Sequence, residues 1–104
     1  MEYRLTITIA DHGNEEAAER CLDAFLERHP ETGPVVSINP RAGTLSVTIA
    51  LDATDPWAAG NLASRIWADG LNQSGLAATP IIDVSISAVE FEDDARRSRE
   101  LVPA

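Results

Sequence analysis

Two short polar segments contain the residue types that metal binding and general acid–base catalysis use. The first supplies Asp11, His12 and Asn14, and the second supplies Asp52 and Asp55. Carboxylates and an imidazole can coordinate a divalent ion such as Mn²⁺ or Zn²⁺. A carboxylate beside an imidazole can also act as a general base. We therefore predict a candidate ligand or metal site where the fold brings these two segments together.

The same residues also have the composition of helix starts. Asn14 precedes Glu15 and Glu16, and Asp55 precedes Pro56. Asn and Asp side chains cap helices, and proline is favoured at the first helical position. Acids in the first turn each stabilise a helix by about 0.3–1 kcal/mol. Capping and turn formation are the preferred interpretation of both segments, and a binding site is the alternative.

An internal repeat indicates which elements hold these segments. Residues 5–10 (LTITIA) recur as residues 45–50 (LSVTIA), and both copies alternate apolar and polar residues as β-strands do. Each copy is followed by a helical pattern and then by a proline-led apolar run, at residues 34–38 and 80–84. The chain therefore consists of two strand–helix–strand units in tandem.

The repeat predicts an α+β fold of the order βαββαβ. The expected strands are at about residues 3–9, 35–39, 44–51 and 81–91. Right-handed crossovers then give a four-stranded antiparallel sheet in the spatial order 4-1-3-2, with two helices on one face. This pattern resembles the ferredoxin-like split βαβ fold. We also expect the strands 3–9 and 44–51 to be parallel central neighbours, which would place Asp11 and Asp52 at one edge of the sheet.

Composition limits the location and the partners of the protein. The 104 residues are predicted to form one domain, residues 1–92, followed by a charged tail, residues 93–104. The formal net charge is −9, from 17 acidic residues and 8 arginines, so we expect neither nucleic acid nor an anionic membrane as a partner. No apolar run approaches the ~20 residues that span a bilayer, and we expect a cytoplasmic protein. The absence of lysine is typical of a GC-rich bacterial genome.

Three activities that domains of this shape host are excluded by single features of the sequence. RNA-recognition domains stack bases on aromatic side chains of the central strands, where this chain has threonine and serine. Soft-metal carriers need paired cysteines, whereas Cys21 is the only cysteine and is expected to be buried on the first helix. Acylphosphatases bind phosphate at the start of the first helix, where Glu15 and Glu16 would repel it. No cofactor is expected.

The second helix has large apolar residues outside its expected core-facing stripe. The stripe consists of Ala58, Ala59, Leu62, Ala63 and Ile66. Trp57, Trp67 and Leu71 fall on its flank or beyond it, given about 100° of rotation per residue. Monomers seldom leave such a patch bare, and tryptophan is common in interface hot spots. We expect the carboxyl-terminal segment or another subunit to cover it.

These observations favour a small acidic, non-catalytic interaction module. It is expected to form a homodimer, or to bind a protein partner, through the flank of the second helix. No nucleophile–base pair stands out, and His29 is expected to be a partly buried residue at the end of the first helix. One alternative is a small-ligand regulatory domain, since Asp11 and Gly13 resemble the first loop of ACT domains. The other is a small enzyme that uses Asp11, His12 and Asp52.

Overall fold

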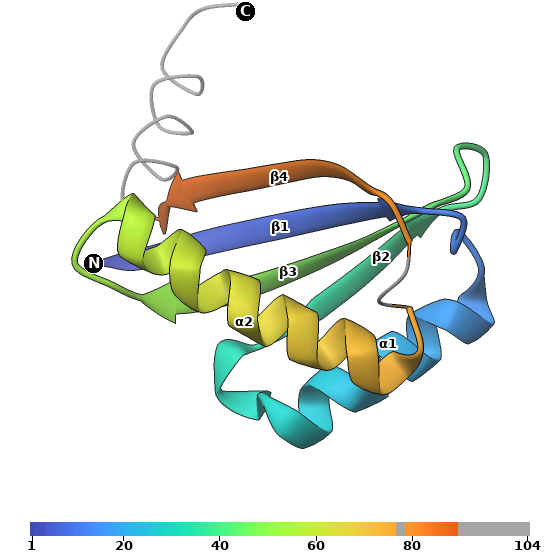
Figure 1. Cartoon of the computed structure of the whole chain (residues 1–104), viewed down its shortest axis with the longest axis horizontal. Helices are drawn as coiled ribbons and strands as arrows, with labels where there is room; N and C mark the ends of the chain where they lie inside the picture. The colour runs from blue at the N-terminus through green and yellow to red at the C-terminus, as the bar shows by residue number, and fades with distance from the viewer. Residues whose placement is uncertain (77–78, 90–104) are drawn as a thin grey trace, which may run out of the picture.

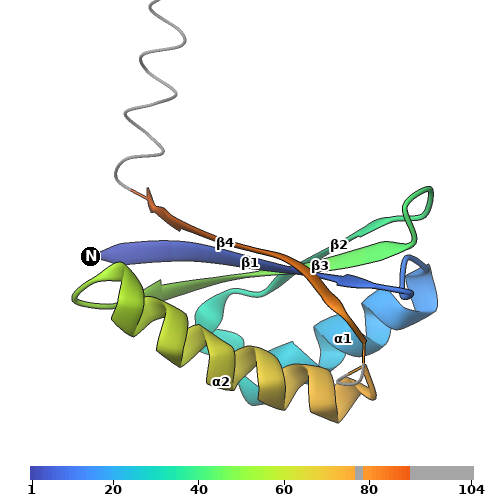
Figure 2. The ribbon, with the colours of Figure 1, turned by 45° about the horizontal axis from the view of Figure 1, so that its top comes forward.

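The computed structural model describes residues 1–76 and 79–89 (Figure 1). The elements are β1 (Glu2–Ala10), α1 (Glu15–Arg28), the 3₁₀-helix η1 (Pro30–Thr32), β2 (Val35–Asn39), β3 (Thr44–Asp52), α2 (Pro56–Ser74) and β4 (Ile81–Ala88). Within these residues the strands form one four-stranded sheet in the order β2-β3-β1-β4, and every pairing is antiparallel. Both α-helices cover the same face of the sheet (Figure 2). The predicted ferredoxin-like split βαβ fold is confirmed.

The central strands β1 and β3 bury one face and leave the other open. Leu5, Ile7 and Ile9 of β1 are buried beneath the helices, together with the matching apolar residues of β3. On the open face, the hydroxyl of Thr6 lies 2.8 Å from that of Thr48, and the Thr8–Ser46 pair repeats this hydrogen bond at 2.8 Å. The alternation that predicted these two strands therefore separates a dry core from a polar surface.

The first helix starts and packs as its sequence indicates. The Asn14 carboxamide oxygen accepts a hydrogen bond from the backbone N–H of Ala17 at 2.8 Å, which caps the helix. Ala17, Cys21 and Phe25 form its buried face. The spacing of four residues keeps these three side chains on one side of α1, against the sheet and α2.

The second helix is rotated relative to the expected stripe. Trp67 and Leu71 are buried in the core, whereas Leu62 is 41% exposed, so the prediction for these three residues was wrong. On the same side the two helices make a close contact: a Cβ at Gly70 would lie 2.4 Å from ring carbons of Phe25. Trp67, Gly70 and Leu71 are spaced three and four residues apart, so all three lie on the buried side of α2.

The last strand is shorter than expected. It ends at Ala88 instead of residue 91. Phe91 and the predicted tail, residues 93–104, lie outside the described residues, so the boundary at residue 92 stays a prediction. Of the helices in the described ranges, neither α1 nor α2 combines the length and apolar character needed to cross a membrane.

Candidate functional site

The structure separates the two polar segments that were predicted to form a site. β1 and β3 are antiparallel, with Glu2 opposite Asp52 and Ala10 opposite Thr44. The prediction of parallel neighbours was wrong, because the β2–β3 hairpin reverses the chain between the two repeats. Since β1 and β3 each have nine residues, the ends of the pair are about 27 Å apart at ~3.4 Å per residue. The bend after β1 and the bend after β3 lie at opposite ends of the sheet (Figure 1).

The bend after β1, which holds Asp11, His12 and Asn14, is built as a turn. Asp11 has φ 69°, a left-handed conformation that aspartate tolerates better than most residues. A Cβ at Gly13 would lie 2.8 Å from backbone atoms of Gly43, so this bend packs directly on the β2–β3 turn. His12 is half-buried here, and Asn14 caps α1. The neighbour of this bend is a hairpin turn, not the second acidic segment.

The bend after β3 is built as a helix start. The Asp55 carboxylate accepts a hydrogen bond from the backbone N–H of Ala58 at 2.8 Å, and Pro56 occupies the first turn. Asp52 is exposed at the end of β3. In the described part of the chain, no group of three or more His, Cys, Asp or Glu side chains could hold a metal ion. The two hydrogen bonds confirm the capping interpretation for Asn14 and Asp55, and the five predicted site residues lie in two groups at opposite ends of the β1–β3 pair.

Cys21 is a core residue and a poor nucleophile. It is fully buried on α1. Burial disfavours the charged thiolate and raises the pKa of the thiol to about 11. A thiol that stays protonated at neutral pH has the character of a small apolar side chain, as the sequence predicted.

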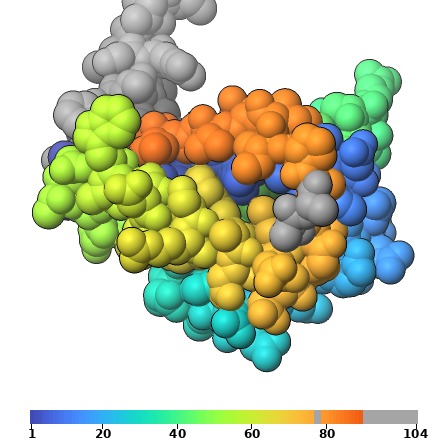
Figure 3. All heavy atoms as spheres, in the orientation of Figure 1, coloured from blue at the N-terminus to red at the C-terminus, as the bar shows by residue number. Residues whose placement is uncertain are grey.

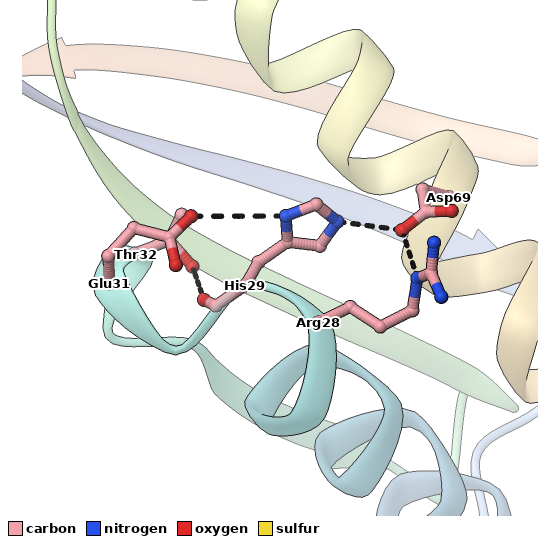
Figure 4. Close-up of polar contacts among 5 residues, drawn as sticks. All are labelled: Arg28, His29, Glu31, Thr32 and Asp69. Atoms are coloured by element: carbon pink, nitrogen blue, oxygen red, sulfur yellow. Dashed lines mark hydrogen bonds and ion pairs between the residues drawn. The ribbon is translucent and has the colours of Figure 1, made fainter.

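A polar cluster joins the end of α1 to α2 (Figure 4). Arg28 Nε donates a hydrogen bond to Asp69 Oδ2 at 2.5 Å, and His29 Nε2 donates to the same oxygen at 2.8 Å. These bonds from Arg28 and His29 lower the pKa of the Asp69 carboxyl below its ordinary value of 3.8. On the other side of the ring, His29 Nδ1 is 3.9 Å from Glu31 Oε1. We call Arg28, His29 and Asp69 the helix clasp.

Of the three residues of the helix clasp, only His29 was singled out from the sequence. His29 was expected at the end of α1, and it is indeed the C-cap residue of that helix. Its partner Asp69 is 40 residues further along the chain, and nothing in the local pattern connects the two. The imidazole lies between the carboxylates of Asp69 and Glu31, and its hydrogen bond to Asp69 connects the end of α1 to α2.

An apolar groove lies between α2 and β4. Its volume is about 800 Å³. Figure 3 shows the blue spheres of β1 between the yellow row of α2 and the orange row of β4. The lining residues include Ile7, Trp57, Trp67, Leu71, Val84 and Ile86. A volume of this size is within the range of ~300–1,000 Å³ that ligand-binding clefts have.

The groove exists because α2 does not cover β4. Val84 and Ile86 are in register with Ile7 and Leu5, so their side chains point to the helix side of the sheet. They are nevertheless 50% and 40% exposed. At Gly60 the helix comes closest, where a Cβ would lie 3.4 Å from Ile86 Cδ1. Ser64 and Ala68 of α2 also line the groove and are small, which helps to leave the space open.

The three residues of the predicted interface all line this groove, in different ways. Trp57 is 83% exposed at one end, whereas Trp67 and Leu71 are buried beneath it. Within residues 1–76 and 79–89, the indole N–H of Trp67 is buried and has no hydrogen-bond partner. Asp69, which is held by the helix clasp, lines the same groove. The groove is therefore mainly apolar, and its polar lining residues are Asn61, Ser64, Asp69, Asn72 and Thr79.

No family model matches this chain, and the comparisons with curated proteins and with solved structures give no match either. What the protein does is therefore inferred from its own residues.

Proposed function

We propose that this protein is a non-catalytic interaction module that forms a homodimer through the outer edge of β4. The observation that supports this function is the exposed apolar surface of that strand. Its exposed branched residues are Ile81, Ile82, Val84 and Ile86, each between 40% and 60% accessible. The outer edge of β4 pairs with no other strand of the described chain. A long apolar edge strand of this kind readily pairs with another chain.

The two edges of the sheet differ in the way that this function requires. β2 has five residues and is flanked by Pro34 and Pro40, which cannot donate ladder hydrogen bonds. β4 has eight residues, no proline and one charged residue, Asp83. A register shift opposite Thr8 and Ile9 disturbs only its first part. The β2 edge is therefore short and bounded by prolines, whereas the β4 edge is longer and contains none.

Charge and symmetry limit how two copies of β4 can pair. In an antiparallel pair of identical strands, the twofold axis passes midway between one residue and the same residue of the second copy. Side chains that oppose each other lie on the same face of the sheet. An axis at Asp83 would bring two carboxylates face to face, which is unfavourable. An axis at either of the two central residues, Val84 or Ser85, avoids this contact. Either choice joins the apolar Val84–Ile86 surfaces of the copies.

The alternatives of a ligand-binding regulatory domain and of a small enzyme lose their structural basis. Both needed the bends at Asp11 and Asp52 to share one rim, and these bends are at opposite ends of the sheet. The thiol of Cys21 is buried and protonated at neutral pH. Pairing at β4 needs none of these groups, since it uses backbone hydrogen bonds and apolar side chains.

A charge placed on the open face of β4 tests the proposed dimer. Ser85 is exposed and in register with Thr6, so Ser85→Glu should not disturb the core. In the dimer, the new carboxylate would face either its own counterpart or Asp83 of the second copy, and both contacts repel. We expect the unchanged protein to have the mass of a dimer by light scattering at micromolar concentration, and the S85E variant to have the mass of a monomer.

The matched control is Ser37→Glu at the other edge of the sheet. Ser37 is also exposed and opposes Ser46, whose hydroxyl is on the open face. S37E should stay dimeric, and both variants should keep the circular dichroism spectrum of the unchanged protein. A monomeric unchanged protein, or an S85E variant that remains dimeric, would contradict the proposal.

A further inference from the structure

We draw no further inference here: the strongest candidate, the apolar groove between α2 and β4, carries none because nothing in the structure shows what covers it.

Discussion

Gly70 of α2 lies against the ring of Phe25 of α1, so closely that only a hydrogen atom fits between them. A Cβ at position 70 would lie 2.4 Å from two ring carbons, and Phe25 is fully buried. Together with the helix clasp, this contact holds the second half of α2 on α1.

The close contact predicts a large effect for a single methyl group. Gly70→Ala should lower the free energy of unfolding by about 1–3 kcal/mol through overpacking, although alanine is the better helix former by ~1 kcal/mol. Urea denaturation measures the change. A matched control is Gly60→Ala, whose Cβ would be 3.4 Å from the movable end of Ile86 and should be neutral or stabilising. Phe25→Leu combined with G70A should cost less than the sum of the single changes, and full additivity would contradict the contact.

The register of the proposed dimer is open to measurement with an arginine at position 85. If the twofold axis passes through Val84, Ser85→Arg brings each new guanidinium opposite Asp83 of the second copy and strengthens the dimer. If the axis passes through Ser85, the two guanidinium groups face each other and weaken it. Each cross-strand charge pair contributes about 0.2–1 kcal/mol. Sedimentation equilibrium at low and high salt distinguishes the registers, and no change in either direction would rule out both.

The helix clasp makes stability depend on pH in the acidic range. Arg28 and His29 hold the pKa of Asp69 below its ordinary value of 3.8. A lowered pKa in the folded state gives a contribution that is fully present above pH 3.8 and is lost as the pH falls through the lowered value. Asp69→Asn should therefore be less stable than the unchanged protein at about pH 6, and the two should converge toward about pH 2. Asp23→Asn, at an exposed position of α1, is the control; an equal loss there would remove the clasp as the cause.

The capping interpretation and the metal-site interpretation predict different effects on stability when residues of the two bends are replaced. Asn14→Ala and Asp55→Ala should each lower the free energy of unfolding by about 0.5–2 kcal/mol, since each removes a capping hydrogen bond. Asp52→Ala should change it by less than ~0.5 kcal/mol, because this residue is exposed at the end of β3. Millimolar Zn²⁺ or Mn²⁺ should leave the melting temperature of the unchanged protein where it is. A rise of several degrees would restore the metal hypothesis.

The parts of the fold that local patterns encode were predictable. Alternation in residues 5–10 and 45–50 identified β1 and β3, and the cap residues Asn14 and Asp55 marked both helix starts. The direction of β3 was misjudged because the turn at residues 40–43 reverses the chain once between the repeats. Because of that reversal, Asp52 and Asp55 lie at the opposite end of the β1–β3 pair from Asp11, His12 and Asn14.

The parts that depend on long-range contacts were not predictable. Trp67 and Leu71 are buried and Leu62 is partly exposed, and Gly70 on the buried side of α2 packs against Phe25. A glycine in a helix pattern indicates close packing only when its neighbour is known. The lining of the groove depends on which side of α2 faces β4, so the sequence predicted it only in part. Of the predicted patch, Trp57 is the member that is exposed.

The prolines on either side of β2 have a consequence for assembly size. A sheet whose two edge strands both pair with other chains would add copies at both edges and grow into a filament, as unprotected strands do in amyloid. Here the β2 edge is short and bounded by Pro34 and Pro40, and β4 is the longer edge of the described sheet. If two copies pair at β4 as proposed, only the short β2 edges remain at the outside of the dimer, which disfavours growth into fibres.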